Sequence, residues 1–306
     1  MDNFQHPTHQ PAGKKVAILG GNRIPFARSN GQYANVSNSE MLTAALNGLV
    51  ERYNLQDKRL GEVVAGAVIK LSRDINLTRE CVLSTALSPQ TPAYDISQAC
   101  ATGLQAAFAV SNKIALGLID SGIAGGVDTT SDAPLGIGDG LRKALLKLNN
   151  AKTNKDRLQA LLSINPKDLI DAPQNGEPRT KLSMGEHQAI TALEWAITRE
   201  AQDESTFNSH KNLARAYDEG FFDDLITPFK GLTRDNNLRP DISLEKLASL
   251  KPVFGKKNAN PTMTAGNSTP LTDGASCVLL GTDEWAAANG LKPLAYLTYQ
   301  ETAAVD

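Results

Sequence analysis

Short apolar runs alternate with helical patterns from Val16 onward, and this alternation constrains the fold more than any other feature of the sequence. Short apolar runs bounded by Gly or polar residues predict buried strands, and apolar residues at helical spacing predict helices. The pattern predicts strands at 16–19, 63–69, 93–97 and 121–127 and helices at 40–55, 73–87 and 101–118. Strands joined by helical crossovers run parallel and need helices on both faces. We therefore expect an α/β fold with a mixed, mainly parallel sheet.

The pattern is interrupted after the fourth expected strand. Residues 133–250 show helical periodicity and loops without a convincing buried strand, which indicates an inserted α-rich cap. The first pattern then returns, with strands expected at 277–280 and 294–299 and a helix at 283–289 between them. Residues 1–14 contain Pro, His, Gln and Asn but no apolar core, so we expect a flexible leader rather than a targeting signal.

The composition argues against several classes of protein. Lys and Arg number 31 against 33 Asp and Glu, a net charge of −2, whereas nucleic-acid binding needs a basic face. The sequence has no apolar run of the roughly 18 residues that a membrane span requires. Its three cysteines, an odd number, fit a reduced compartment better than a disulfide framework. We therefore expect a globular, cytoplasmic protein.

Cys100 is the strongest single candidate for chemistry. It follows an expected strand and opens an expected helix, and Ala99, Ala101 and Gly103 surround it. Backbone N–H groups at a helix start stabilise a thiolate, which is the nucleophilic form of cysteine. The small neighbours leave room for a substrate. Spacing alone leaves a second interpretation open, that of a buried structural cysteine.

The remaining cysteines and histidines carry weaker signals. Cys81 and Cys277 lie among aliphatic residues, so we expect them in the core, and no cysteine pair has metal-ligand spacing. His210 lies on a polar helical stretch and is expected in solvent, whereas His187 is a weak candidate for a pocket. No glycine cluster has the phosphate-loop or dinucleotide pattern, which disfavours nucleotide-dependent enzymes.

Residues 141–162 form a basic amphipathic stretch. Its apolar positions are leucines, and its polar positions include six lysines and arginines. Such a stretch lies on a membrane surface, docks a partner, or forms a solvated helical hairpin. The sequence leaves these alternatives open.

The residues around Cys100 resemble the nucleophile region of thiolases. The resemblance begins with Ser97–Ala106 and Ile123–Asp128 and extends over the whole chain from Lys15. Further matching motifs, in the order of the family, are Asn22–Phe26, Thr198–Asp203, Ser209–His210, Asp235–Pro240, Leu247–Pro252 and Thr264–Gly274. The long basic stretch after Leu135 looks most like the thiolase subunit of fatty-acid β-oxidation complexes.

The resemblance implies a thiolase fold of two similar halves with a cap over the first. The N-terminal half would comprise 15–132 and 251–290, the cap 133–250, and the start of a largely missing second half 291–306. The implied reaction is acyl transfer in fatty-acid β-oxidation, either cleavage of 3-ketoacyl-CoA by CoA or the reverse condensation. Cys100 would attack the keto carbon and hold the acyl group as a thioester. Coenzyme A would be a substrate, and no metal or redox cofactor is implied.

Matching positions carry over as CoA-binding candidates. Met184 corresponds to the cap residue that touches pantetheine, and Arg239 to an arginine near the adenine end of CoA. Phe254 and the Ala265–Gly266 turn match the wall of the pantetheine tunnel. Thr269 stands where many relatives have a serine that contacts CoA, so a hydroxyl is kept there.

Three active-site elements of the family are absent from these 306 residues. They are an Asn-Glu-Ala-Phe-type motif, a Gly-His-Pro motif whose His activates the nucleophile, and a Cys-x-Gly-Gly-type loop. Because such residues act as a unit, the resemblance implies that this chain is inactive alone. The Ala- and Leu-rich helix 101–118 would expose a face that the second half covers. This face indicates an oligomer, and the resemblance implies a homodimer or tetramer, with a hydratase/dehydrogenase subunit as a further partner.

Two other functions stay open from the sequence. A non-catalytic acyl-CoA-binding or assembly subunit on a thiolase half-fold would account for the missing His. A ketoacyl-synthase-like condensing enzyme also uses a cysteine at a helix start, although the cap motifs and the return motif argue against it.

Overall fold

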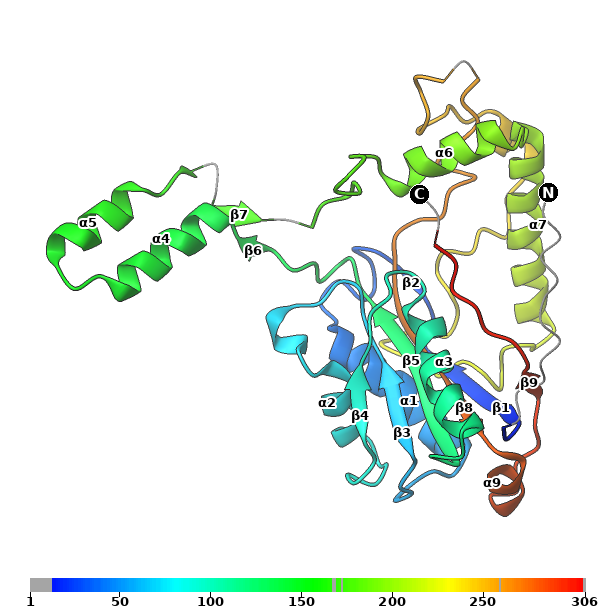
Figure 1. Cartoon of the computed structure of the whole chain (residues 1–306). Helices are drawn as coiled ribbons and strands as arrows, with labels where there is room; N and C mark the ends of the chain where they lie inside the picture. Colours follow the sequence, from blue (N-terminus) through cyan, green and yellow to red (C-terminus); the bar gives the residue numbers. More distant parts are fainter. Residues whose placement is uncertain (1–12, 167–168, 172, 259, 305–306) are drawn as a thin grey trace. The chain divides into compact units, whose positions relative to one another are not determined.

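The computed structural model describes residues 13–166, 169–171, 173–258 and 260–304 (Figure 1). Most of the expected leader, 1–14, lies outside this part of the chain. The described residues form two compact units. Unit 1 takes them from Met1–Asp132, His210–Pro240 and Pro270–Asp306, and unit 2 takes them from Ala133–Ser209 and Asp241–Thr269.

Residues 210–240 belong to unit 1, although the sequence predicts them in the cap. This segment contains no strand that periodicity would reveal, but its backbone forms hydrogen bonds with the backbone of the first strand. The Arg23 N–H donates to Leu225 O (3.0 Å), and the Thr227 N–H donates to Arg23 O (2.9 Å). The first boundary of the units, after Asp132, lies where the sequence pattern changes.

The last two predicted boundaries also differ from the structure. Residues 251–269 belong to unit 2 rather than to the N-terminal half. One contact that holds them there is the hydrogen bond from the Gly255 N–H to Glu186 Oε2 (3.1 Å). Within 291–306, expected to open a second half, the described residues belong to unit 1, because a strand at Ala295–Leu297 pairs with the first strand of the sheet.

The main sheet of unit 1 is mixed, as the sequence predicts. Its strands follow the order β4-β3-β5-β8-β1-β9, and β2 pairs with β8. The strands are β1 (Val16–Arg23), β2 (Ala27–Arg28), β3 (Glu62–Ala65), β4 (Ala93–Asp95), β5 (Ser121–Asp128), β8 (Thr272–Gly281) and β9 (Ala295–Leu297).

The prediction of a mainly parallel sheet is wrong in that detail. Among the strands that the structure describes, only the β3–β4 and β3–β5 ladders are parallel, and β8 runs antiparallel to both β5 and β1. The reason lies in the inserted segment. The chain leaves the sheet at Asp128 and re-enters beside it, since Asp128 pairs with Gly274 near the start of β8. The insertion therefore connects neighbouring strands as a wide hairpin, which needs no crossover helix.

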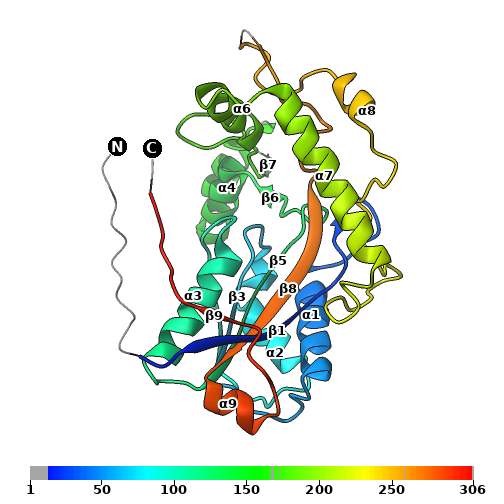
Figure 2. The ribbon, with the colours of Figure 1, turned by 90° about the vertical axis from the view of Figure 1, so that its right-hand side faces the viewer.

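Helices cover both faces of this sheet, as predicted. Helices α1 (Asn38–Arg52) and α2 (Leu77–Leu83) pack on one face and α3 (Thr102–Ala115) on the other, so Figure 2 shows α1 and α3 on opposite sides of the strands. Side chains alternate between the faces along each strand. Val63 belongs to the cluster under α1, and its neighbour Val64 to the cluster under α3. The 3₁₀ helix η1 (Ser72–Asp74) and helix α9 (Asp283–Ala288) complete the helical elements that lie wholly in this unit's described part.

Helix α3 has one buried and one open side. Ala106, Val110 and Ile114 are buried against the sheet, whereas Leu104 is 57% exposed and Leu116, just after the helix, is 75% exposed. The helix therefore carries apolar side chains beyond the face that packs on the sheet, which agrees with its Ala- and Leu-rich sequence.

Unit 2 contains helices and one short ladder. Its elements are β6 (Gly136–Ile137), α4 (Asp139–Asn150), α5 (Asn154–Leu162), β7 (Ile170–Asp171), α6 (Met184–Glu194) and α8 (Leu244–Ala248), with β6 and β7 antiparallel. Helix α7 (Arg199–Asp218) begins in unit 2, and its residues from His210 onward belong to unit 1. Figure 1 shows α4 and α5 as a helical hairpin, inside which Ala144 and Ala160 are buried. Among the described helices, none combines the length and apolarity that a membrane crossing needs.

Candidate functional site

Cys100 lies where the sequence predicts, between β4 and α3. It is exposed and stands one residue before Ala101, which caps α3. The cap differs from those of α1, α5, α6, α8 and α9, where a Ser or Thr hydroxyl accepts a hydrogen bond from the first turn. Helix α3 has no such side-chain cap. Cys100 therefore precedes the N-terminal end of α3, which is the positive end of the helix dipole. No side-chain oxygen is bonded to the first turn of α3.

The backbone before Cys100 is bent into an unusual conformation. Ala99 has a φ of 44°, in the left-handed region that non-glycine residues rarely adopt. Thr102 bridges this bend: its Oγ1 donates to Ala99 O (2.7 Å) and accepts from the Gln98 N–H (2.9 Å). The resulting tight turn places Cys100 ahead of the helix rather than inside it. This settles one alternative, since Cys100 is not a buried structural cysteine.

Glycines let the backbone close tightly behind the Cys100 turn. A Cβ on Gly66, just after β3, would lie 1.9 Å from Ile96 O and 2.9 Å from the Thr102 methyl carbon. A Cβ on Gly126 of β5 would lie 3.7 Å from the Cα of Gly103. Gly66 is therefore the glycine that the close approach requires, because a Cβ on Gly126 would make ordinary van der Waals contact and one on Gly103 would meet nothing within 4 Å.

The other two cysteines are core residues, as predicted. Cys81 and Cys277 are both buried. Burial raises the pKa of the Cys81 thiol and raises the pKa of the Cys277 thiol to about 12. Both thiols therefore stay protonated near neutral pH and are poor nucleophiles.

Arg239, in unit 1, is exposed, and its backbone is fixed by helix α7. The Arg239 N–H donates to His210 Nδ1 (3.2 Å), and Lys211 Nζ donates to Pro240 O (2.7 Å). Burial, and then the nearby charge of Arg239, lower the pKa of His210. His210, predicted to be in solvent, is half-buried and has a backbone partner. Its partner is 29 residues away along the chain, where helical periodicity carries no information.

Phe254 packs against the start of α6, which begins at Met184, in unit 2. Met184 is the first residue of α6 and is 74% exposed. A Cβ on the next residue, Gly185, would lie 2.5 Å from the Phe254 ring, so that ring packs directly on the helix backbone. His187, one turn further, makes a 3.1 Å hydrogen bond with Thr180 Oγ1.

The Ala265–Gly266 turn is built around a buried threonine. Thr264 is fully buried, and its Oγ1 accepts from the N–H groups of Gly266 and Asn267 (both 3.1 Å). Ala265 and Thr269 are exposed on either side. The predicted CoA-binding residues thus form three local groups: Arg239 in unit 1, and Met184–Phe254 and the 265–269 turn in unit 2.

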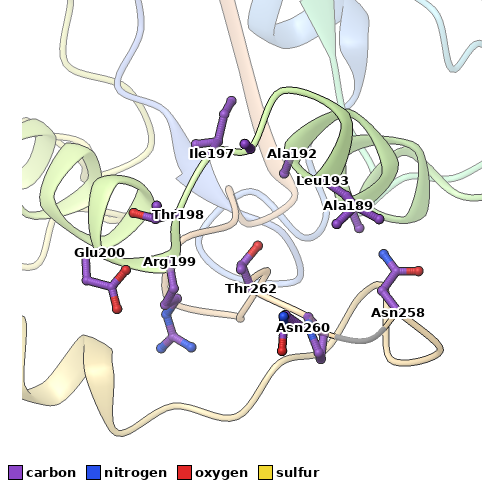
Figure 3. A pocket seen from close by; sticks show the side chains of 12 residues that line it. Ala189, Ala192, Leu193, Ile197, Thr198, Arg199, Glu200, Asn258, Asn260 and Thr262 are labelled. Atoms are coloured by element: carbon purple, nitrogen blue, oxygen red, sulfur yellow. The ribbon is translucent and has the colours of Figure 1, made fainter.

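A separate cavity of about 370 Å³ lies within unit 2 at the junction of α6 and α7 (Figure 3). None of the predicted site residues lines it. Its wall is formed by Ala189, Ala192, Leu193, Ala196, Ile197, Thr198, Arg199, Glu200, Asn258, Asn260, Pro261 and Thr262. Arg199 is already bonded to Asp203 (2.7 Å), so its guanidinium is not a free anion-binding group. In the described part of the chain, no group of three or more His, Cys, Asp or Glu side chains could hold a metal ion.

Comparison with known proteins decides the family. Residues 16–284 match the family model described as "Thiolase, N-terminal domain". The chain belongs to the thiolase family. It is 38% identical over 292 residues to the 3-ketoacyl-CoA thiolase of Pectobacterium carotovorum subsp. carotovorum (strain PC1), covering 93% of this chain and 66% of that protein. The 3-ketoacyl-CoA thiolase of Vibrio cholerae is 37% identical over 301 residues, covering 96% and 69%.

Solved thiolase structures share the fold. The acetyl-CoA acetyltransferase of Bacillus anthracis superimposes with a TM-score of 0.77 at 28% identity, covering 94% of this chain and 70% of that one. Human mitochondrial 3-ketoacyl-CoA thiolase in complex with CoA gives a TM-score of 0.77 at 23% identity, covering 92% and 68%. The chain therefore has the thiolase fold and spans about two thirds of the length of these family members.

Sequence reasoning missed two parts of the site. The Cys-Ala-Thr-Gly run indicates the start of α3, but the sequence does not predict that the Thr102 hydroxyl bonds to two backbone groups before Cys100. The left-handed Ala99 has no sequence signal, because Gly or Asn is the usual residue there.

Proposed function

We propose that this chain forms the nucleophile-bearing part of a thiolase, an acyltransferase that cleaves 3-ketoacyl-CoA with CoA or runs the reverse condensation. The single observation that carries the proposal is the exposed Cys100 ahead of an α3 start without a side-chain cap, in a chain of the thiolase family. The names of its relatives support 3-ketoacyl-CoA as the substrate. Fatty-acid β-oxidation is the process in which such a reaction serves.

The reaction needs one covalent intermediate. The Cys100 thiolate attacks the keto carbon, the bond between that carbon and C2 breaks, and the electron pair left on C2 takes up a proton to give acetyl-CoA. The thiol of a second CoA then attacks the acyl-cysteine, releasing acyl-CoA and the free Cys100. Backbone N–H groups at the start of α3 would stabilise the oxyanion formed in each attack. No metal or redox cofactor enters this scheme, and CoA is a substrate.

Proton transfer needs groups that these 306 residues do not supply. The family's Gly-His-Pro and Cys-x-Gly-Gly-type motifs are absent from the sequence. We propose that this chain alone accepts an acyl group slowly and does not turn over. Steady turnover by the 306-residue chain would contradict this part of the proposal. A chain that binds acyl-CoA but never becomes acylated would instead be a non-catalytic subunit.

The CoA contacts are proposed from the three local groups of residues. Arg239 is an exposed cation suited to a phosphate, and Met184 and Phe254 offer an apolar surface suited to pantetheine. Ala265, Gly266 and Thr269 are proposed as further CoA contacts, and the first and last of these residues are exposed.

Partners and location are proposed on more general grounds. The open apolar side of α3 supports an oligomer, a homodimer or tetramer, and a hydratase/dehydrogenase subunit is a further partner. The α4–α5 hairpin combines basic residues with exposed leucines, which supports peripheral membrane contact. We place the protein in the cytoplasm.

Acyl labelling tests the proposal. The wild-type chain is incubated with acetyl-CoA, and the intact mass is compared with that of Cys100→Ala and Cys81→Ala. We expect one acetyl group on the wild type and on Cys81→Ala, and none on Cys100→Ala. Equal labelling of Cys100→Ala would remove Cys100 from the mechanism.

A further inference from the structure

The turn before α3 contains an arrangement that the acyl-transfer scheme does not use. The scheme needs Cys100 and the helix start, whereas the structure also holds Ala99 at a φ of 44°. An alanine there is strained, because its Cβ crowds the neighbouring carbonyl oxygen in the left-handed conformation. Such strain persists only where surrounding contacts hold it.

Thr102 supplies contacts that hold the strained residue. Its hydroxyl donates to Ala99 O (2.7 Å) and accepts from the Gln98 N–H (2.9 Å). One oxygen is therefore bonded to the backbone of both residues. Two backbone bonds close the same turn, from the Ala101 N–H to Gln98 O (3.0 Å) and from the Thr102 N–H to Ala99 O (3.1 Å). Cys100 is the residue enclosed by all four bonds.

The position of Thr102 is itself fixed by packing. It is buried, and its methyl group fills the space beside Gly66 that a Cβ would need. The side chain therefore has little freedom to turn its hydroxyl elsewhere. The cap Ser or Thr of α1, α5, α6, α8 and α9 bonds forward into its own helix, but Thr102 bonds backward to the residues that precede Cys100.

We propose that Thr102 is a positioning residue that keeps Ala99 left-handed and so presents Cys100 at the start of α3. The proposal rests on the proposed function, in which Cys100 is the nucleophile. Thr102 does not touch the substrate. Without its hydroxyl, Ala99 relaxes toward an ordinary conformation, and Cys100 moves from its place immediately before the helix start.

The test measures the alkylation rate of Cys100 with iodoacetamide, followed by peptide mapping. Thr102→Val keeps the shape of the side chain and removes the hydroxyl, whereas Thr102→Ser keeps the hydroxyl. We expect about a tenfold slower rate for Thr102→Val, equivalent to ~1.4 kcal/mol, and a rate close to wild type for Thr102→Ser. Cys81 and Cys277 are internal controls, because both are buried and react only if the variant unfolds.

A change at Ala99 separates positioning from a general effect on stability. Glycine adopts the left-handed conformation without strain, so Ala99→Gly should restore most of the rate when it is added to Thr102→Val. If Thr102 only stabilises the fold, the added glycine will not rescue the rate. Ala99→Val, whose branched side chain disfavours that conformation, should slow Cys100 even with Thr102 intact, which keeps the test open if Thr102→Val does not fold.

The outcomes are distinguishable from those of the proposed function. A folded Thr102→Val protein that is alkylated at the wild-type rate overturns the positioning role, as does a wild-type rate for Ala99→Val. A slow Thr102→Val protein that Ala99→Gly fails to rescue overturns it too. If the wild-type Cys100 is alkylated but takes no acetyl group from acetyl-CoA, the proposed function fails while the positioning role stands.

Discussion

The Cys100 turn and the α4–α5 hairpin both expose residues that carry a functional signal, but they are held in opposite ways. The turn packs closely on Gly66 and is bonded through the hydroxyl of the buried Thr102. The hairpin buries Ala144 and Ala160, and its Arg142–Asp139 ion pair (2.5 Å) is exposed and lies within α4. The proposed nucleophile is therefore held by buried contacts, whereas the membrane contact proposed for the hairpin depends on side chains exposed on its outside.

Breaking a buried ion pair of unit 1 should lower stability more than any other change, and breaking an exposed pair of the hairpin is the comparison. Arg23 and Asp235 form a bidentate pair (2.7 and 2.9 Å) with side chains 11% and 8% exposed. Asp235→Asn leaves the guanidinium buried without its counter-charge, so we expect a loss of about 3 kcal/mol in the free energy of unfolding. Urea denaturation measures this loss.

Asp139→Asn is the matched control in the hairpin. Its carboxylate is exposed and paired with Arg142 and Lys143, and exposed pairs contribute little. We expect no measurable change in the denaturation midpoint. A loss for Asp139→Asn as large as for Asp235→Asn would erase the contrast between the two regions.

A second prediction concerns the outer surface of the hairpin. If the hairpin contacts a membrane, removing an exposed positive charge from it weakens binding to anionic vesicles. We expect Lys147→Ala to lose ~1 kcal/mol of binding free energy, about a fivefold change in affinity, in vesicle sedimentation. Lys246→Ala, an exposed lysine of unit 2 outside the hairpin, is the control and should leave binding unchanged. Equal binding by both variants and the wild type would favour a solvated hairpin.

The smallest expected effect is a pH dependence in unit 1 that the hairpin, which contains no histidine, does not share. Burial lowers the pKa of His210, whose neutral Nδ1 accepts from the Arg239 N–H. A lowered folded-state pKa means that the stabilisation is present above the unfolded-state pKa of about 6.5 and is lost as the pH falls through the folded-state value. We expect about 0.5 kcal/mol, because the bond is partly exposed.

Thermal unfolding between pH 5 and 8, the range over which imidazole titrates, measures this dependence. His210→Asn keeps an acceptor without the titration and should flatten the profile relative to the wild type. His187→Asn is the control that should retain the slope assigned to His210. An unchanged slope in His210→Asn would assign the pH dependence to other groups.

Much of the fold followed from local patterns in the sequence. The expected strand at 121–127 is β5, and the expected helix at 101–118 contains α3, because a short apolar run and helical spacing both report burial directly. The direction of β8 did not follow, since it depends on where the insertion re-enters the sheet. The place of 210–240 in unit 1 depends on backbone hydrogen bonds to β1, which no side-chain pattern encodes.

The candidate site was predictable at the level of Cys100 and no further. A small-residue run between a strand and a helix indicates a nucleophile position, and the structure places an exposed cysteine there. The strain at Ala99 and the backward bonds of Thr102 are properties of the folded turn. Likewise, the Phe254 ring packs on Gly185, and sequence spacing does not predict a contact between segments so far apart in the chain.

The central claim is that Cys100 carries the acyl group between two CoA molecules. The most direct measurement isolates the acetylated chain, removes free acetyl-CoA, maps the label by peptide mass, and then adds CoA. The account predicts a label on Cys100 that disappears as acetyl-CoA forms in equal amount. A label on any other residue, or one that CoA does not remove, would contradict it.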